Sequence, residues 1–419
     1  MRSRTPSRRR LRSTCVALTA AGLLAVPPLT GLASARPAPT VTPPPTPTPT
    51  PTQSARPGAD AFARLTPAVA RQLDEAILGV MKKADVPGVI VSVSAPRKGS
   101  YVRAFGVADK ATGQRMSTAM NVRIGSETKT FTVTALLELV DQGKLRLDDP
   151  IEKYVPGVPN GDKITLRDLA GMRSGLFNYS QDEGFDHVLE TDPNHRFTPE
   201  ELLDYSFKHP VMFEPGTKFF YSNTNLILLG LVVEKVGGLP LDQYIQRHVL
   251  APAGLRHTLF PTGSEFPRPH PQGYTDESAD GKVTVSTDWD PSWAWAAGAM
   301  ISDLPDLRSW ARTVATGTLL TPATQAQRLK TEPSGIAGTG YGLGIFDVQG
   351  WIGHNGSLPG YETLTIYLPG PQATVVVMLN TDILYDKVIE PSTLFGEAIT
   401  KIVSPQHVFN LPVPVSATR

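Results

Sequence analysis

The sequence predicts an α+β fold in which one antiparallel sheet is assembled from both ends of the chain and a mainly helical region is inserted between them. Apolar, β-branched segments bounded by turn residues predict the strands, at residues 88–94, 101–107, 340–345, 363–368 and 373–379. Amphipathic patterns predict helices near both ends, at residues 66–83 and 388–403, and in the middle, at residues 200–207, 223–236 and 241–248. The terminal helices would then cover the sheet.

The first residues are typical of an export signal. Arginines crowd residues 2–12, an apolar run follows to Leu32, and Ala33-Ser34-Ala35 offers a cleavage site, so we expect a signal peptide over residues 1–35. Residues 8–10 are also compatible with a twin-arginine signal, which leaves the Sec and Tat routes open. The apolar run is interrupted by prolines and is shorter than about 20 residues, so no stable membrane span is expected. The expected location is secreted, extracellular or associated with the cell wall.

The remaining chain divides into a spacer, one large domain and a tail. Residues 36–56 alternate Pro and Thr, which favours an extended linker. One large domain is expected over residues 57–405, followed by a C-terminal tail over residues 406–419. Cys15, in the signal, is the only cysteine. Net charge is +1, from 40 basic and 39 acidic residues without a basic stripe, so a nucleic-acid partner is not expected.

Ser126 is the only serine with a lysine, Lys129, three residues later, and an apolar helical segment follows it. Residues at i and i+3 share a helix face, so the amine would lie beside the hydroxyl. Ser126 would sit in the first helical turn, where backbone N–H groups favour a developing oxyanion. A serine hydroxyl needs a nearby base to become a nucleophile, and Lys129 can supply one. A solvated lysine on a helix face is the alternative.

Two further motifs carry candidate site residues. Tyr221-Ser222-Asn223 precedes an apolar helix, and its phenol and carboxamide can pass protons and bind an amide. The alternative is an Asn helix cap beside a half-buried tyrosine. His354-Asn355-Gly356-Ser357 follows a predicted strand edge, where Gly356 permits close backbone approach and the Ser357 N–H can complete an oxyanion hole. The alternative there is an Asn-Gly turn with an incidental histidine.

Taken in this order, the three motifs resemble the serine β-lactamase-like and penicillin-binding superfamily. The resemblance is closest to class C β-lactamase-like hydrolases, above all the secreted serine D-Ala-D-Ala carboxypeptidases, which use Tyr-Ser-Asn and a His-x-Gly triplet. It extends over most of the chain, with supporting segments at residues 106–109, 145–150, 164–169, 173–176 and 297–300. It implies the β-lactamase/transpeptidase-like fold.

The resemblance also implies roles for the candidate residues. Ser126 would form an acyl-enzyme that water hydrolyses, while Lys129 and Tyr221 handle the protons. The N–H groups of Ser126 and Ser357 would bind the oxyanion. Asn223 would hold the acyl-side amide, His354 would lie beside Tyr221 and tune it, and Trp293 would line the cleft.

The ordinary pKa values of lysine and tyrosine do not show whether Lys129 or Tyr221 acts as the base. A free lysine titrates near 10.4, so a neutral Lys129 at pH 7 requires about 4–5 kcal/mol of selective destabilisation of its charge. A phenolate at Tyr221 requires a similar amount, so the pair is expected to share protons. No metal or cofactor is expected, since the histidines lack paired-ligand spacing.

Two departures concern the substrate. The carboxypeptidases bind the terminal carboxylate with an arginine on the strand after Tyr-Gly-Leu-Gly, where this chain has Phe346, and with a threonine where it has Asn355. We expect a secreted serine hydrolase of D-alanyl-D-alanine carboxypeptidase type, with a peptide, ester or β-lactam as substrate. A related esterase or D-amino-acid amidase, or a non-catalytic wall- or penicillin-binding protein, is the alternative. A Ser-His-Asp triad enzyme is disfavoured because no Gly-x-Ser-x-Gly occurs. The oligomeric state is left open.

Overall fold

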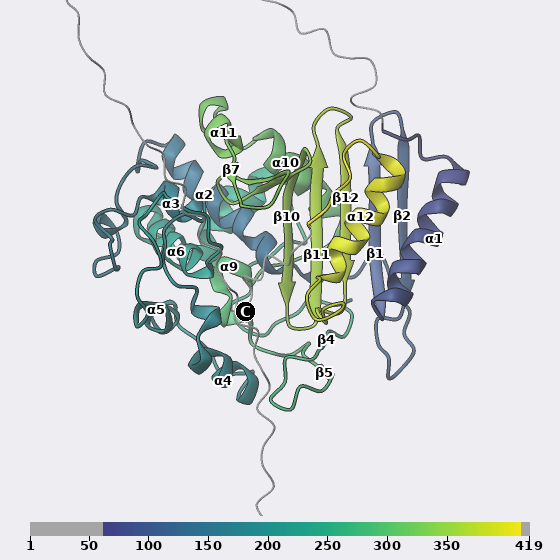
Figure 1. Cartoon of the computed structure of the whole chain (residues 1–419), viewed down its shortest axis with the longest axis horizontal. Helices are drawn as coiled ribbons and strands as arrows, with labels where there is room; N and C mark the ends of the chain where they lie inside the picture. Colours follow the sequence, from purple (N-terminus) through teal and green to yellow (C-terminus); the bar gives the residue numbers. More distant parts are fainter. Residues whose placement is uncertain (1–61, 412–419) are drawn as a thin grey trace, which may run out of the picture. The chain divides into compact units, whose positions relative to one another are not determined.

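The computed structural model describes residues 62–411, and both ends of this range contribute to one antiparallel sheet. The strand order is β2-β1-β12-β11-β10-β9-β8-β7, so the first strands lie beside the last one (Figure 1). This arrangement confirms the predicted fold class. The strands of this sheet are β1 (Gly88–Ala95), β2 (Gly99–Gly106), β7 (Glu332–Pro333), β8 (Thr339–Tyr341), β9 (Phe346–Val348), β10 (Trp351–Leu358), β11 (Tyr361–Leu368) and β12 (Ala373–Leu379).

The central strands are buried on both faces. β11 and β12 bury every residue, and Val91 of β1 lies opposite Val377 of β12 in the register. Such continuous apolar runs are stable only when other elements cover both sides of the sheet.

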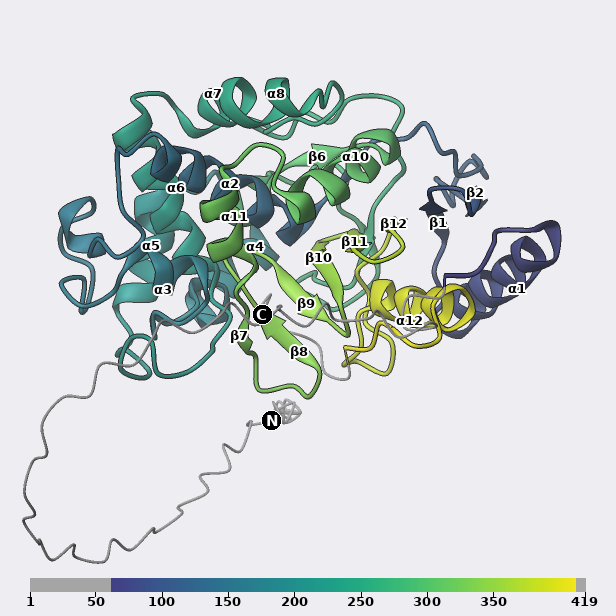
Figure 2. The same cartoon turned by 90° about the horizontal axis from the view of Figure 1, so that it is seen from above.

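Helices provide that cover. On one face, α12 (Pro391–Val403) packs on β11 and β12, and α1 (Pro67–Lys83) lies beside it (Figure 2). Thr66 caps α1 by accepting the Val69 N–H at 3.3 Å, and the helix buries an i, i+4, i+7 stripe at Leu73, Ile77 and Val80. On the other face, α10 (Leu304–Thr316) packs against β10, β11 and β12.

The inserted region is built around two buried helices, α2 (Thr128–Asp141) and α6 (Asn223–Gly237), which pack against each other. The other elements between β2 and β7 are short: β3 (Val122–Arg123), η1 (Gly125–Glu127), η2 (Ile151–Lys153), α3 (Leu166–Ala170), η3 (Tyr179–Gln181), α4 (Glu183–Thr191), α5 (Pro199–Phe207), α7 (Leu241–Ile245), η4 (Gln246–Leu250), α8 (Ala251–Ala253), β4 (Tyr274–Thr275), β5 (Thr284–Val285), η5 (Pro291–Trp293), α9 (Trp295–Gly298), β6 (Ile301–Ser302) and α11 (Pro322–Leu329). β3 pairs with β6 and β4 with β5 as separate two-stranded ladders.

Two segments differ from the sequence-based expectations. The strand predicted over residues 340–345 is wrong, because β8 ends at Tyr341 and the chain turns before β9, with Gly344 at a φ of 66°. Residues 406–411, which we assigned to a tail, contact the folded part. Phe409 is fully buried, and the Trp351 indole N–H donates to the His407 carbonyl oxygen at 2.6 Å. The predicted signal peptide and the Pro/Thr linker lie outside the described residues.

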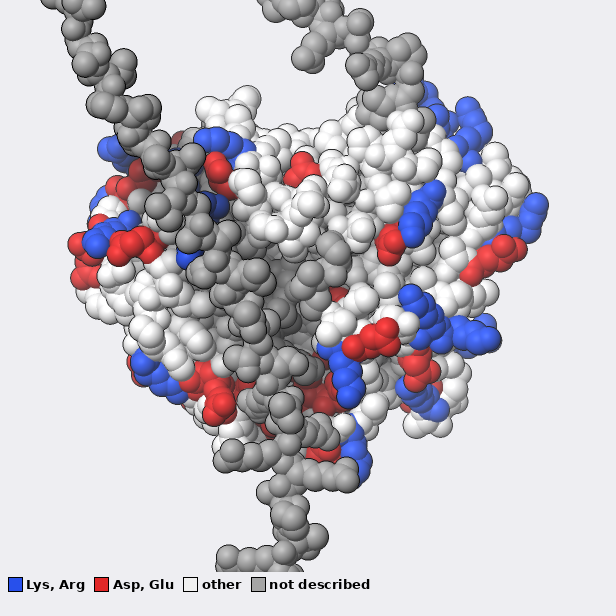
Figure 3. All heavy atoms as spheres, viewed as in Figure 1, with Lys and Arg blue, Asp and Glu red and all other residues white. Residues whose placement is uncertain are grey.

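Surface and hydropathy patterns add two observations. On the face drawn in Figure 3, Lys and Arg side chains are interspersed with Asp and Glu. Within residues 62–411, no single helix is long and apolar enough to cross a membrane, and only α6 taken together with Leu241–Ala253, across a 73° bend, reaches that length and composition.

Candidate active site

The Ser126 hydroxyl is held in a sharp turn between β3 and α2. Gly125, Ser126 and Glu127 form the 3₁₀ turn η1, so Ser126 lies two residues before the first residue of α2 and not, as expected, within its first turn. The turn requires a φ of 52° at Gly125, a conformation that glycine adopts without strain. It is anchored from the β6 side, since Ile124 N–H donates to the Met300 carbonyl oxygen at 2.9 Å and Met300 N–H donates to Thr128 Oγ1 at 3.1 Å.

Lys129 lies directly beneath this hydroxyl. Its Nζ is 2.8 Å from Ser126 Oγ and 2.8 Å from the Ala297 carbonyl oxygen, and the side chain is fully buried. Burial lowers the pKa of Lys129 well below its ordinary value, because a charged ammonium loses its hydration there. A neutral amine in this position can donate to Ala297 while its lone pair accepts the serine proton.

Tyr221 approaches the same hydroxyl from the loop before α6. Its phenol interacts with the Ser126 side chain, and Lys129 Nζ lies 4.8 Å from the centre of its ring. Burial raises the pKa of Tyr221 well above its ordinary value, with further increases from Tyr341 and Glu390, while the Ser126 hydrogen bond opposes the shift. The phenol is therefore neutral at pH 7. The opposite pKa shifts thus favour the uncharged forms of both Lys129 and Tyr221 beside one serine side chain.

His354 lies near Tyr221 but is hydrogen-bonded elsewhere. The ring centres of the two residues are 6.1 Å apart, whereas His354 Nε2 is 3.0 Å from the Tyr341 hydroxyl and Nδ1 is 2.5 Å from the Asn355 carbonyl oxygen. These partners assign the proton to Nδ1, so Nε2 accepts from Tyr341. Burial lowers the pKa of His354 to about 3, which keeps the ring neutral. Tyr341 was not singled out from the sequence, although it begins the Tyr-Gly-Leu-Gly segment.

Strand β10 brings the Ser357 backbone against the serine turn. β9 pairs with β10 only over residues 351–353, so the later half of β10 has a free edge on that side. At Gly356 a Cβ atom would lie 1.9 Å from the Ile124 carbonyl oxygen, and at Gly125 one would lie 2.5 Å from Ser357 N. Only glycine permits this approach. The N–H groups of Ser126 and Ser357 thereby come from two adjoining backbones, as an oxyanion hole requires.

A narrow cleft of about 10 Å³ opens beside Ser126 and is lined by Asn223, Tyr179, Trp293 and Leu358 among others. Asn223, the first residue of α6, places Nδ2 3.2 Å from Ser180 Oγ, and the helix is preceded by Ser222 as its cap residue. The Tyr179 hydroxyl donates to the Trp293 carbonyl oxygen at 2.6 Å. Tyr179 fixes the wall of the cleft and carried no distinguishing signal in the sequence.

A second, wider pocket of about 200 Å³ lies on the other side of Tyr221 and His354. Phe346, 6% exposed, forms part of its wall with its ring centre 5.3 Å from that of His354. Asn355 also lines this pocket, and its Nδ2 donates to the buried carboxylate of Glu390. The two positions that depart from the carboxypeptidase pattern therefore meet in one pocket.

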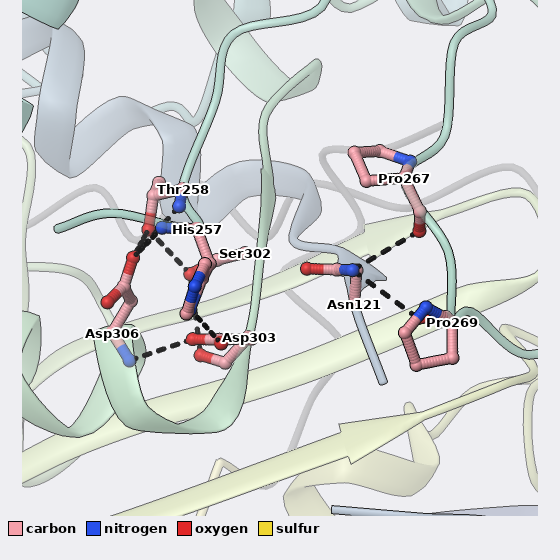
Figure 4. A network of polar contacts seen from close by, with 8 residues as sticks. All are labelled: Asn121, His257, Thr258, Pro267, Pro269, Ser302, Asp303 and Asp306. Atoms are coloured by element: carbon pink, nitrogen blue, oxygen red, sulfur yellow. Dashed lines mark hydrogen bonds and ion pairs between the residues drawn. The ribbon is translucent and has the colours of Figure 1, made fainter. Parts of the chain in front are cut away.

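His257, Asp303 and Asp306 form a cluster of the kind that could hold a metal ion (Figure 4). Each residue offers one side-chain nitrogen or oxygen atom, and these atoms lie within 4.8 Å of one another. Its polar atoms are already engaged, since Asp303 Oδ1 caps α10 by accepting the Asp306 N–H at 3.0 Å and Asp303 Oδ2 lies 2.7 Å from His257 Nδ1. Asp306 Oδ2 accepts the backbone N–H groups of His257 and Thr258, each at 2.8 Å. These bonds join a loop to the start of α10, and we assign the cluster a structural role.

Comparisons with known proteins identify sequence relatives. Residues 73–391 match the family model named Beta-lactamase. A protein named as penicillin-binding protein PbpX from Bacillus subtilis (strain 168) is 28% identical over 287 residues, which cover 68% of this chain and 68% of that protein. A protein named as a D-alanyl-D-alanine carboxypeptidase from Escherichia coli (strain K12) is 31% identical over 173 residues, covering 38% of this chain and only 40% of the relative.

Solved structures of hydrolases are similar to this chain in fold and in sequence. A D-stereospecific amidohydrolase from Streptomyces sp. superposes with a TM-score of 0.70 at 29% identity, covering 80% of this chain and 98% of that one. The D-amino acid amidase from Ochrobactrum anthropi SV3 in complex with D-phenylalanine gives a TM-score of 0.67 at 26% identity, covering 79% and 98%. Because the family match spans most of the chain, this protein belongs to the Beta-lactamase family, within the serine β-lactamase and penicillin-binding superfamily of hydrolases.

Proposed function

We propose that this protein hydrolyses amide or ester bonds through an acyl-enzyme on Ser126, and that its substrate is a peptide of the D-alanyl-D-alanine type. The observation that carries the proposal is the pairing of a fully buried Lys129 amine, 2.8 Å from Ser126 Oγ, with the Tyr221 phenol on the same oxygen. A binding protein has no use for a buried amine of lowered pKa against a serine hydroxyl, whereas a serine nucleophile requires a nearby base.

The proposed reaction has two halves. In the first, the Ser126 proton passes to Lys129, Oγ bonds to the substrate carbonyl carbon, and the N–H groups of Ser126 and Ser357 bind the oxyanion. The scissile C–N or C–O bond then breaks as the proton reaches the leaving group through Tyr221. In the second half, water repeats these steps on the acyl-enzyme, transferring its hydroxyl to the acyl carbon and its proton back to Ser126. His354 positions Tyr341 beside this relay.

Asn223 and Trp293 are proposed to hold the acyl side of the substrate, because both line the narrow cleft that contains Ser126. The carboxamide of Asn223 can bind a substrate amide, and Trp293 supplies an apolar wall.

A D-amino-acid amidase or related esterase is the second candidate, favoured by the pocket at Phe346 and Asn355. The carboxypeptidase pattern has an arginine and a threonine at these positions to bind a terminal carboxylate, and this chain has neither. The structural similarity to a D-stereospecific amidohydrolase and a D-amino acid amidase supports this candidate. We also propose export and cleavage after Ala35, which N-terminal sequencing of the mature protein would test.

Matched substrates separate these candidates. Purified protein is incubated with a D-Ala-D-Ala peptide, a D-amino-acid amide, a p-nitrophenyl ester and their L counterparts, and each product is quantified. Intact mass is followed over time with a fluorescent penicillin. D-selective cleavage together with a Ser126-dependent adduct supports the proposal. Binding of penicillin without an adduct and without turnover of any substrate would indicate a non-catalytic binder instead.

A further inference from the structure

The wider pocket beside Tyr221 has no part in the steps above that form the acyl-enzyme. Its volume is about 200 Å³, and its walls come from β8, β9, β10 and the segment before α6. Six of its lining residues are apolar, Phe219, Phe220, Ile336, Phe346, Val348 and Leu411, and the rings of Tyr221 and Tyr341 add to them. For scale, an apolar cavity of about 150 Å³ holds a benzene ring.

The polar groups of this pocket are already bonded to the protein. The Tyr341 hydroxyl donates to His354 Nε2 at 3.0 Å, and Asn355 Nδ2 donates to Glu390. Among the described residues that line the pocket, none is a lysine or an arginine, and His354 is neutral. A substrate carboxylate placed here would lose its hydration without gaining a cation.

Buried carboxyl groups, rather than cations, lie behind this pocket. Glu390 is 4% exposed, and within residues 62–411 it forms no ion pair with a lysine or arginine. Glu362, fully buried, lies opposite Ser357 in the β10–β11 register. Burial raises the pKa of Glu362 well above its ordinary value, nearby Glu390 raises it further, and burial raises the pKa of Glu390 to about 7. This part of β10 is thus backed by carboxyl groups, whereas a carboxylate-binding site needs positive charge.

The pocket adjoins the residue that we propose delivers the proton to the leaving group. Tyr221 lines the pocket and its phenol interacts with the Ser126 side chain, so the phenol connects the nucleophile with the pocket. The opposite cleft, with Asn223 and Trp293, contains Ser126 itself and is separate. The proton released by Ser126 must reach the departing amine or alkoxide, and Tyr221 is the group placed to deliver it.

We propose that this pocket binds the leaving group of the substrate and selects an uncharged, apolar or aromatic one over a free carboxylate, with Phe346, Asn355 and Glu390 as the residues that determine this specificity. The inference rests on the proposed acyl-enzyme mechanism. It favours the second candidate function over the first, because it assigns the substrate class as D-peptides whose last residue is amidated or otherwise neutral, and it places the side chain of that residue against Phe346.

The test uses three substrates that share the acyl group N-acetyl-D-alanyl and differ in the leaving group. The leaving group is D-phenylalanine amide in the first, D-phenylalanine with a free carboxylate in the second, and methanol in the third, a methyl ester. The methyl ester releases methanol, which does not reach the pocket. We expect kcat/KM for the amide to exceed that for the free acid by about 10-fold or more in the wild type, the scale of one lost charge-assisted contact. The ratio of the two values is measured within each variant, so partial loss of folded enzyme cancels.

Three variants complete the design. Phe346→Arg supplies the missing cation and should shift the ratio toward the free acid by about 10-fold. Glu390→Gln removes the ionisable carboxyl group, keeps a partner for Asn355, and should shift the ratio in the same direction. Met212→Arg adds the same charge at a side chain that is 48% exposed and should leave the ratio as in the wild type.

The outcomes are distinct. If the methyl ester is hydrolysed but kcat/KM for the amide is equal to or lower than that for the free acid, the specificity assignment is wrong and the mechanism stands. A ratio that Phe346→Arg and Glu390→Gln leave unchanged would overturn the assignment to these residues. Absence of turnover of every substrate, the methyl ester included, would overturn the proposed function and this inference together.

Discussion

Replacing Lys129 and Tyr221 singly and together tests whether they act as one proton-handling unit. Both contact Ser126 Oγ, with Lys129 Nζ at 2.8 Å, so each substitution interrupts the same proton transfer. Lys129→Met fills the space of the buried side chain without an amine, and Tyr221→Phe removes only the hydroxyl. Each should lower kcat/KM by about 100-fold, equivalent to about 2.7 kcal/mol. Independent residues would give a double-mutant loss of about 10⁴-fold, or about 5.4 kcal/mol.

Because the two groups share one oxygen, we expect the double variant to be little worse than the poorer single one. The assay is release of p-nitrophenol from the N-acetyl-D-alanyl ester, with single-turnover kinetics to isolate acylation. Lys129→Met should also raise the melting temperature, because burial lowers the pKa of Lys129 and the protein loses stability wherever the unfolded chain would protonate that amine. Fully multiplicative losses would refute the shared-proton reasoning. A Lys129→Met variant with wild-type acylation would refute any role of the amine as base.

Two further predictions concern buried charges outside the reacting groups. Burial raises the pKa of Glu127 to about 8 from 4.5, so the stability that it contributes is complete below pH 4.5 and is lost as pH rises through 8. Chemical denaturation at about pH 5 and pH 8 should therefore show that the free energy of unfolding of Glu127→Gln, relative to that of the wild type, increases with pH by up to about 5 kcal/mol. A difference that does not change with pH would contradict this. The fully buried Arg328 guanidinium donates to Thr134 Oγ1 at 2.8 Å and to the Thr130 carbonyl oxygen at 2.9 Å, beneath the helix that follows Ser126. Arg328→Ala should cost about 3 kcal/mol or more of unfolding free energy, whereas Arg328→Met should cost less because it fills the space without a buried charge, and equal losses would show that the charge carries no penalty.

Local patterns in the sequence were sufficient to predict most of the sheet and its covering helices. The helix predicted over residues 66–83 is observed at Pro67–Lys83, and the strand predicted over residues 373–379 has the same bounds as β12. The strand predicted over residues 340–345 failed because Gly344 takes a positive φ and turns the chain, which an apolar pattern does not reveal. Turn geometry of this kind depends on the two strands that it joins.

In the candidate site, too, the sequence predicts some contacts, whereas others are visible only in the structure. Ser126 and Lys129 are neighbours in the sequence, so helical spacing predicts that they meet. Glu390 lies 35 residues from Asn355, and the hydrogen bond between them joins β10 to the residue before α12. Tyr341 likewise reaches His354 only because β8 and β10 flank β9. No spacing rule connects such pairs, so the polarity of the pocket at Phe346 became visible only in three dimensions.

The most direct test of the proposed mechanism is covalent labelling of Ser126. The protein is mixed with a penicillin or with the p-nitrophenyl ester, quenched in acid, and measured by intact mass and peptide mapping beside Ser126→Ala. We predict a single acyl adduct on the peptide that contains Ser126, formed before steady-state turnover and missing in Ser126→Ala, whose melting temperature should stay close to that of the wild type. An adduct on another residue, or wild-type turnover by Ser126→Ala, would contradict the assignment of Ser126 as the nucleophile.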